Sequence, residues 1–411
     1  MLAEIYPRYH TRYRLLPVLG PYLDGFVKWL RNEGYPTLPI RLRVRATGSL
    51  DAELRARGVS DIGQLTSADL LEYGPQHARD DVYRSAVLHS LVRYLGELGV
   101  LAPLPETRSI SLISAYRGYL DNVRGLAAST VSLHAATVAR LLAFIGYDDD
   151  PEHLSILCHG DIECFIELLG RAHCRASLQH DVGHLRSFLR YLATRGMIKV
   201  ELSERIDTPR VYRDEQLPRS VPWPTVQALL RSIDRSCTMG RRDYAMLLLV
   251  ATYGLRSCEV VALTLDDIDW HAERLRVPRS KVQGPLELPL TPEVGAAIIH
   301  YVRDGRPDLP YREVFLRVRS PAGTLKPTAL TEAFQGCVRR SGLPIPFQGP
   351  HCLRHSLAVY LLRQGASLKQ IGDLLGHRSP ESTCVYLRLQ IEDLREVALP
   401  LPVTANGQVQ R

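Results

Sequence analysis

The chain has 411 residues, of which 45% are apolar and 23% are charged, an ordinary globular composition that argues against wholesale disorder. This length suggests two or three domains. The formal net charge is +7, from 51 basic and 44 acidic residues. Residues 1–107 hold 13 basic and 12 acidic side chains, residues 108–215 hold 13 and 14, and residues 216–411 hold 25 and 18. A polyanionic partner is therefore expected to bind mainly to the C-terminal half.

No membrane segment or export signal is expected. The longest apolar run, around Ala245–Val250, is far shorter than the roughly 20 residues that cross a bilayer. The N-terminus has no apolar signal-peptide core. The eight cysteines are scattered without a paired framework, which is typical of reduced thiols. These features predict a cytoplasmic protein.

Apolar residues at spacings of three and four predict helices through most of the chain, most clearly over 86–98 and 185–194. The motif Leu-Val-Arg-Tyr-Leu at 91–95 parallels Phe-Leu-Arg-Tyr-Leu at 188–192, and a glycine follows each motif four residues later. We interpret residues 1–106 as a helical domain that is a degenerate repeat of a second helical domain over 107–207. The alternative is two unrelated helical bundles with chance matches.

A polar, proline-bounded linker is predicted over 208–219, followed by a domain over 220–411 that opens at Pro222-Trp223-Pro224. Within that domain, Leu275-Arg276-Val277 and Leu286-Glu287-Leu288 alternate between apolar and polar residues, and Pro and Gly separate them. This pattern predicts a small antiparallel sheet inside a mainly helical domain.

Arg256 lies at a predicted turn between two helices. The apolar helix over 244–253 is expected to end at Gly254, and Ser257 is expected to cap the next helix. An arginine beside free backbone N–H groups suits a phosphate. Taken alone, this feature favours the alternative of a surface arginine paired with Glu259.

Lys281 lies in the predicted turn between the two strands. Lysine is rare in this chain, with five lysines against 46 arginines, so a lysine can mark a place where a compact, titratable ammonium group is needed. From this feature alone, a solvated hairpin lysine is the better interpretation.

The segment His351-Cys352-Leu353-Arg354-His355 places His351 and Arg354 on one helical face. An imidazole beside a guanidinium suits acid–base chemistry on a phosphate. His351 and His355 have the spacing of a two-histidine metal site, but the arginine and the lack of a suitably placed carboxylate argue against a metal.

A fourth motif runs from Ser367 to Tyr386. Ser367 and Gly376 are expected to bound a helix, and His377 lies just past its end. Ser379-Pro380 predicts the start of another helix, with Tyr386 two turns along it. A tyrosine on an apolar helix is usually a core residue, and this motif alone predicts no more than that.

Together, two arginines, two histidines, a lysine and a tyrosine are the groups needed for phosphoryl transfer without a metal. Their order resembles the tyrosine recombinase (phage integrase) family, whose pattern is an arginine with an acidic residue three positions on, a hairpin lysine, His-x-x-Arg, Leu-Gly-His and a tyrosine. The matching residues are Arg256 with Glu259, Lys281, His351, Arg354, His377 and Tyr386. The resemblance covers about residues 220–400 and, less specifically, the helices from Gly125 to Leu192.

The resemblance implies a mainly α fold with a small antiparallel β-sheet in the C-terminal domain. In such a fold, helical core-binding domains, the one over 107–207 being SAM-like, precede the tyrosine recombinase catalytic domain. It also implies that Tyr386 attacks a DNA phosphate and forms a 3′-phosphotyrosyl link. Arg256, Arg354 and His377 would hold the non-bridging oxygens, Lys281 would protonate the leaving 5′-oxygen, and His351 would help to take the tyrosine proton. Glu259 and His355 are expected only to support the site.

The implied partner is double-stranded DNA at the nucleoid, bound by a homo-tetramer with or without other recombinases and without metal, ATP or another cofactor. The activity is that of an integrase or transposase of a mobile element. Residues 391–399 suit a helix exchanged between protomers, and residues 400–411 suit a flexible tail. Residues 1–106 depart from the common layout, in which a β-rich domain stands there. The arm over 6–14 either contacts DNA or is simply solvated.

Two other classes of protein and a zinc site are also compatible with parts of this sequence. A DNA-binding accessory protein would not need the tyrosine. A type IB topoisomerase or a hairpin-forming resolvase uses similar chemistry, but the Leu-Gly-His motif and the chain layout favour a recombinase. A zinc site among the cysteines and histidines of 158–184 is disfavoured, because no Cys-x-x-Cys occurs there.

Overall fold

The computed structural model describes residues 1–74, 82–104, 106–204, 206–211, 218–278, 286–377 and 379–389. The predicted fold class is confirmed, because helices dominate these residues and their strands form one three-stranded antiparallel sheet. The chain divides into two compact units, one of Met1–Ile62, Gly74–Tyr94 and Leu217–Arg411 and the other of Gly63–Tyr73 and Leu95–Gln216. In the described part of the chain, no helix is long and apolar enough to cross a membrane.

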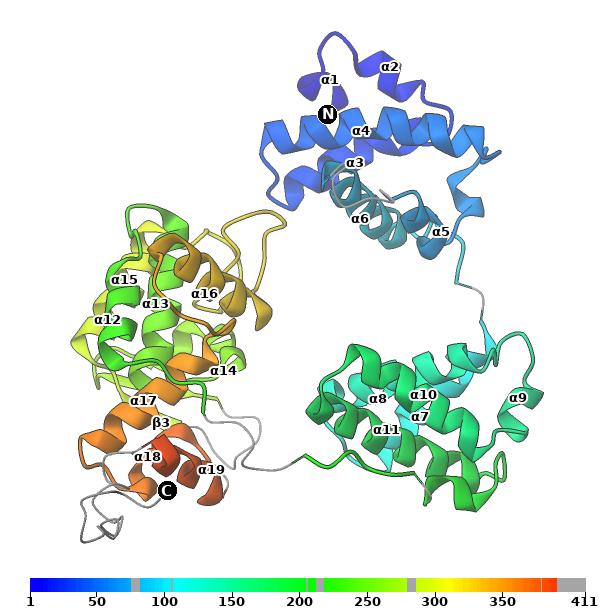
Figure 1. The fold of residues 1–411 in the computed structure, drawn as a ribbon. Coiled ribbons are helices and arrows are strands. Elements are labelled where there is room, and N and C mark those ends of the chain that lie inside the picture. Colours follow the sequence, from blue (N-terminus) through cyan, green and yellow to red (C-terminus); the bar gives the residue numbers. More distant parts are fainter. Residues whose placement is uncertain are drawn as a thin grey trace, which may run out of the picture. The chain divides into compact units, whose positions relative to one another are not determined.

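Short helices at the N-terminus lead into two long ones (Figure 1). The bounds are α1 (Leu2–Ile5), α2 (His10–Arg14), α3 (Gly20–Asn32), α4 (Thr37–Ala56), α5 (Ser67–Glu72) and α6 (Val82–Glu97). Asp51 on α4 is fully buried, and its Oδ1 accepts hydrogen bonds from the backbone N–H groups of Val18 and Leu19 at 3.0 and 2.8 Å. This carboxylate satisfies donors just before α3 that would otherwise be buried without a partner, and so ties α3 to α4.

A second group of helices follows: α7 (Arg108–Asn122), α8 (Ala128–Phe144), α9 (Glu152–Ser155), α10 (His159–Ala172) and α11 (Arg175–Thr194). The helix α8 packs against α7 and α11, and α10 packs against α11. Their core contains the aromatic side chains of Tyr116, Phe165 and Phe188, all buried. The helices predicted over 86–98 and 185–194 correspond to α6 and α11 and are confirmed.

Polar groups are buried within this second core. The hydroxyl of Tyr116 lies 3.0 Å from Nδ1 of His134 and 2.9 Å from Oγ of Ser187. The rings of His134 and His184 lie 4.2 Å apart. Burial, with the neighbouring His184 and Arg124, lowers the pKa of His134 to about 4. His134 is therefore neutral in the folded protein at neutral pH.

We expect the folded protein to lose stability through His134 as the pH falls from about 6.5 towards 4. Below the unfolded-state pKa of about 6.5, the unfolded chain binds a proton that the folded core excludes, which lowers the free energy of unfolding by about 2 kcal/mol between pH 7.5 and pH 5.0. Urea titrations of the full chain at the two pH values measure this loss. The His134→Gln variant should lose about 2 kcal/mol less than the wild type over the same interval; equal losses would contradict the assignment.

The C-terminal half forms the larger helical body (Figure 1). Its elements are α12 (Trp223–Arg231), α13 (Thr238–Tyr253), α14 (Ser257–Ala262), β1 (Ile268–Asp269), β2 (Arg274–Val277), β3 (Leu286–Pro289), α15 (Pro292–Asp304), α16 (Thr328–Ser341), α17 (His351–Arg363), α18 (Leu368–Leu375), α19 (Glu381–Cys384) and the 3-10 helix η4 (Val385–Leu389). The predicted hairpin is confirmed, with Leu275 opposite Leu288 and Val277 opposite Leu286.

The helix α13 is the centre of this body. Its residues from Tyr244 to Ala251 are all buried, and it packs against α12, α14, α15, α16 and α17. A helix that is apolar on every side must be surrounded by other elements. The packing of these five helices therefore fixes the position of the C-terminal end of α13.

Two local predictions differ from the structure. Ser257 is the first residue of α14, and the N-cap position belongs to Arg256. Tyr386 does not lie two turns along an α-helix, because α19 ends at Cys384 and the chain tightens into η4. In both places the sequence signal for a helix start is correct to within two residues, while tertiary contacts described below determine the exact geometry.

Candidate active site

The turn between α13 and α14 holds Arg256. Gly254 follows α13 with a φ of 65°, the left-handed conformation that commonly ends helices. A Cβ atom on Gly254 would lie 2.4 Å from Cδ2 of Leu375, so a side chain there would force the Leu375 side chain to move. The backbone N–H of Arg256 donates to Oε2 of Glu259 at 2.8 Å, and Nη1 donates to Oε1 at 2.8 Å. The ion pair with Glu259 thus orients the guanidinium.

Two arginines bring the ends of α13 and α18 together. Arg354 on α17 is only 2% exposed; its Nη1 donates to the carbonyl of Gly254 and its Nη2 donates to that of Leu375 at 2.6 Å. Nη2 of Arg256 donates to the carbonyl of Gly376 at 3.2 Å. These carbonyls stand at helix C-termini, where the helix dipole favours a cation. Two positive groups are therefore held side by side at this junction.

His377 follows directly. Gly376 has a φ of 64° and ends α18, and the backbone N–H of His377 donates to the carbonyl of Gly372 at 2.9 Å. Nδ1 of His377 lies 2.8 Å from Oγ1 of Thr383, which fixes the direction of the ring. The ring stacks on Tyr386 with a centroid distance of 6.3 Å and an interplanar angle of 18°.

Tyr386 is buried, with 1% of its surface exposed, among the apolar side chains of α17 and α18. Its hydroxyl lies 3.0 Å from Nδ1 of His355. Burial raises the pKa of Tyr386 above its usual 10, and the nearby positive charge of Arg354 opposes the shift. The phenol is therefore protonated at neutral pH.

His351 and His355 lie one turn apart on α17, with ring centroids 4.5 Å apart and planes at 86°. Desolvation lowers the pKa of His351, and the charges of Arg354 and Arg256 lower it further, although part of its side chain is exposed. Desolvation, with the neighbouring His351 and Arg354, lowers the pKa of His355 to about 4. Both imidazoles thus tend to be neutral in this cationic surrounding.

The structure brings five of the six predicted site residues into one cluster: Arg256, His351, Arg354, His377 and Tyr386. Lys281 and the predicted segments 391–399 and 400–411 lie outside the described residues. His355, expected only to support the site, is the residue in direct contact with the Tyr386 hydroxyl. The spacing of four from His351 was the sequence signal that placed both histidines on one face. Among the described residues, no group of three or more His, Cys, Asp or Glu is arranged to hold a metal ion.

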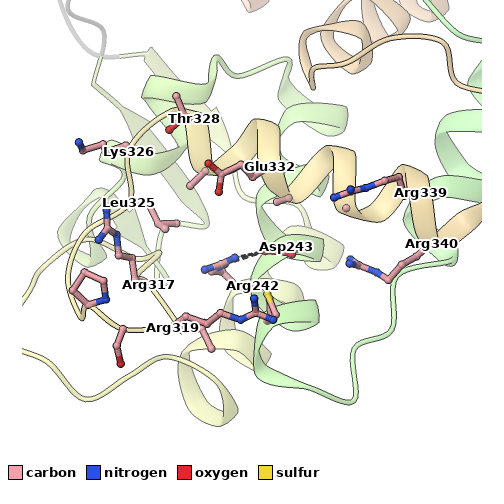
Figure 2. A pocket seen from close by; sticks show the side chains of 17 residues that line it. Arg242, Asp243, Arg317, Arg319, Leu325, Lys326, Thr328, Glu332, Arg339 and Arg340 are labelled. Carbon is pink, nitrogen blue, oxygen red and sulfur yellow. Dashed lines mark hydrogen bonds and ion pairs between the residues drawn. The ribbon is translucent and has the colours of Figure 1, made fainter. Parts of the chain in front are cut away.

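A second feature, absent from the sequence predictions, is a cavity of about 560 Å³ that we call the basic pocket (Figure 2). It lies between the start of α13, the segment 317–326 and the length of α16. Its charged lining residues are Arg242, Asp243, Arg317, Arg319, Lys326, Glu332, Arg339 and Arg340. Six of these side chains are cationic and two are acidic, and Asp243 is paired with Arg242 at 2.7 Å, so the lining carries a positive excess. None of the clustered site residues lines the basic pocket.

Comparisons with known proteins show which family the chain resembles along its length. The model of the phage integrase family matches residues 224–392. The integrase/recombinase y4rA of Sinorhizobium fredii is 35% identical over 403 residues, covering 95% of this chain and 97% of that protein. The tyrosine recombinase XerD of Listeria monocytogenes is 28% identical and covers 70% of this chain and 96% of its own length.

Among solved structures, the post-cleavage complex of the XerH site-specific recombinase with palindromic difH substrate has the same fold, with a TM-score of 0.53 at 15% identity over 80% of this chain and 92% of that one. The chain belongs to the phage integrase family of tyrosine recombinases. It is a site-specific recombinase that cleaves and rejoins double-stranded DNA through a phosphotyrosyl intermediate.

Proposed function

We propose that the catalytic residues of this recombinase are Arg256, Lys281, His351, Arg354, His377 and Tyr386. The observation that carries the proposal is the position of Tyr386, whose ring stacks on His377 and whose pKa is influenced by the charge of Arg354. A phenol beside fixed cations is suited to attack a phosphodiester, because the cations stabilise the charge that develops on the phosphoryl oxygens.

In this mechanism, Oη of Tyr386 forms a bond to the scissile phosphorus while the bond from phosphorus to the 5′-oxygen breaks. The products are a 3′-phosphotyrosyl link and a 5′-hydroxyl, and a 5′-hydroxyl from a second strand reverses the step. Arg256, Arg354 and His377 hold the non-bridging oxygens. Lys281 protonates the leaving oxygen, and His351 helps to remove the tyrosine proton. The free energy of the broken DNA phosphodiester bond is conserved in the phosphotyrosyl bond, so rejoining does not need ATP.

The test uses a duplex selected from a randomised library by its binding to the protein, with a nick beside the cleavage position so that the covalent adduct accumulates. We call this DNA the selected duplex. Peptide mapping of the adduct should place the nucleotide on Tyr386. A nucleotide on any other residue would overturn the assignment.

We propose the following division of labour along the chain. Residues 220–411 form the catalytic domain, residues 208–219 a linker, and residues 107–207 the core-binding domain that grips DNA. Residues 1–106 form a further helical domain, a degenerate repeat of the core-binding one, that contacts DNA or another protomer. The near-neutral charge of both helical regions is compatible with DNA binding if each presents one basic face.

We also propose that DNA backbone phosphates lie along the basic pocket. The surplus of arginine and lysine there stands in the half of the chain that carries the whole net charge. Arg319, Lys326 and Arg339 are exposed at its surface, and Arg317 is half-buried. Such cations release condensed counterions from DNA when they meet phosphates.

The Arg317→Gln/Arg319→Gln/Arg339→Gln triple variant should therefore bind the selected duplex with a weaker dependence on salt. Each lost phosphate contact lowers the slope of log K against log salt concentration by about 0.9. Filter binding from about 50 to 200 mM salt measures the slope. The control is Arg303→Gln on α15, which is exposed and does not line the basic pocket. An unchanged slope in the triple variant would place the DNA elsewhere.

The assembly is proposed to be a homo-tetramer on two duplexes, with or without other recombinases, as the chemistry of paired strand exchange requires four nucleophiles. The protein would act at the nucleoid in the cytoplasm, as an integrase or transposase of a mobile element. Residues 391–399 would be exchanged between protomers. The size of the complex on the selected duplex, measured with and without residues 390–411, tests the tetramer and the exchange of the C-terminal segment.

A further inference from the structure

Tyr386 forms a hydrogen bond with His355, a residue that is not among the six proposed catalytic residues. The two side chains meet although 31 positions separate them in the chain, and the donor–acceptor distance is 3.0 Å. Their rings lie 5.6 Å apart with an interplanar angle of 59°, so His355 approaches the phenol obliquely and reaches it through Nδ1. In the described part of the chain, no hydrogen bond joins His351 to Tyr386. The residue in contact with the reacting oxygen is thus His355.

The surroundings of His355 keep its imidazole neutral. From its own helix, His351 and Arg354 face it; from the loop after α18, His377; and from the segment before α12, Arg219. Each of these groups is cationic or becomes cationic on protonation, and the neutral Tyr386 completes the contact. Burial lowers the pKa of His355 to about 4, and these charges add to the shift. A neutral imidazole has one nitrogen with a free lone pair, which is what a proton acceptor requires.

Tyr386 supplies the matching donor. Burial raises the pKa of its phenol, so the hydroxyl keeps its proton until it reacts. In the tautomer that carries its proton on Nε2, the neutral imidazole accepts an O–H···N hydrogen bond from the phenol at Nδ1. The bond becomes a proton-transfer path when a negative phosphodiester binds beside Arg354 and His377, because that charge offsets the cations that disfavour an imidazolium.

We propose that His355 is a catalytic residue that accepts the proton of Tyr386 during strand cleavage. This inference rests on the proposed role of Tyr386 as the nucleophile. As the bond from Oη to phosphorus forms and the bond from phosphorus to the 5′-oxygen breaks, the phenolic proton passes to Nδ1 of His355, and the 5′-oxygen takes its proton from Lys281, the acid proposed above. During rejoining, the proton on Nδ1 returns to the departing phenolate. His351, whose ring meets that of His355 edge to face, assists from the exposed side.

The first test measures the single-turnover rate of adduct formation on the selected duplex from pH 6 to pH 9. The variants are His355→Ala and His355→Asn; Asn retains a hydrogen-bond acceptor near the position of Nδ1 but does not take up a proton. We expect both variants to react about 10²-fold or more slowly than the wild type at pH 7. Their rates should rise steeply with pH, because the phenolate must then form without a base.

Two results would overturn the proposal. A His355→Asn variant that reacts at the wild-type rate would show that His355 only holds the hydroxyl in place. A His355→Ala variant that reacts faster than the wild type would show that the bond restrains Tyr386 rather than activating it. The matched control is His351→Asn, one turn earlier on the same helix, which should be slowed less than His355→Asn.

The second test separates loss of a base from loss of structure. A fluorinated tyrosine is placed at position 386 of the His355→Asn protein, which lowers the phenol pKa and makes a base less necessary. We expect the rate at pH 8 to recover by at least about tenfold, since the phenolate fraction rises in proportion. A misfolded variant would not regain activity. If the variant binds the selected duplex normally and its rate still does not recover, the proposal is overturned. Adduct formation by Tyr386→Phe would instead reject the nucleophile itself.

Discussion

The Tyr386→Phe variant is expected to bind the selected duplex with unchanged affinity and to form no covalent adduct. The substitution removes one oxygen atom, which is the proposed attacking group, and leaves the buried ring in contact with His377. Phenylalanine has no oxygen to bond to phosphorus, so adduct formation is abolished and not merely slowed. Denaturing gels after overnight incubation with the selected duplex measure the adduct. The lost hydrogen bond to His355 lowers the free energy of unfolding by only about 1 kcal/mol, so the variant remains folded.

A tyrosine outside the site provides the control for this experiment. Tyr360 lies on α17 and stacks on Trp223, with ring centroids 4.4 Å apart. The Tyr360→Phe variant should form the adduct at the wild-type rate. An adduct from the Tyr386→Phe protein would mean that another residue attacks the DNA, and peptide mapping of that adduct would identify it.

The Arg354→Lys variant is expected to lose both activity and stability although it keeps the charge. The guanidinium spans the carbonyls of Gly254 and Leu375, and a single ammonium group has neither the shape nor the number of donors to replace that fork. Adduct formation should fall about 10²- to 10³-fold, as for the loss of a fixed donor to a developing oxyanion. The free energy of unfolding should fall by about 1 to 3 kcal/mol, because a buried acceptor loses its donor.

Single-turnover cleavage of the selected duplex and urea unfolding measure the two losses separately. The matched control is Arg363→Lys, at the exposed end of the same helix. That variant should match the wild type in both assays. If Arg354→Lys retained full activity with reduced stability, Arg354 would be a structural link between α13 and α18 and not a phosphate ligand.

Signals that act over a few residues account for the elements that were predicted correctly. Gly254 and Gly376 end their helices because only a residue without Cβ adopts the left-handed conformation at low cost. Ser367 caps α18 through reciprocal bonds with Gln370. The strand pairing follows from alternation of apolar and polar residues. Each of these causes is complete within a short segment, so the amino-acid sequence determines it directly.

The remaining features arise between segments that are distant in the chain. His355 meets Tyr386 only because α17 packs against η4, and Arg354 reaches Gly254 across 100 positions. The basic pocket joins the start of α13 to the segment 317–326 and α16, so its excess charge is visible in the sequence only as the +7 of residues 216–411.

The sequence therefore determined the fold class, the main helix ends, the family and the candidate residues of the site, because these depend on local spacing and residue chemistry. The tertiary structure decided which histidine contacts the tyrosine, where the two guanidinium groups are anchored and where the cations gather. Those contacts depend on how whole helices pack, since a side chain can only be oriented by neighbours that packing has brought within a few ångströms.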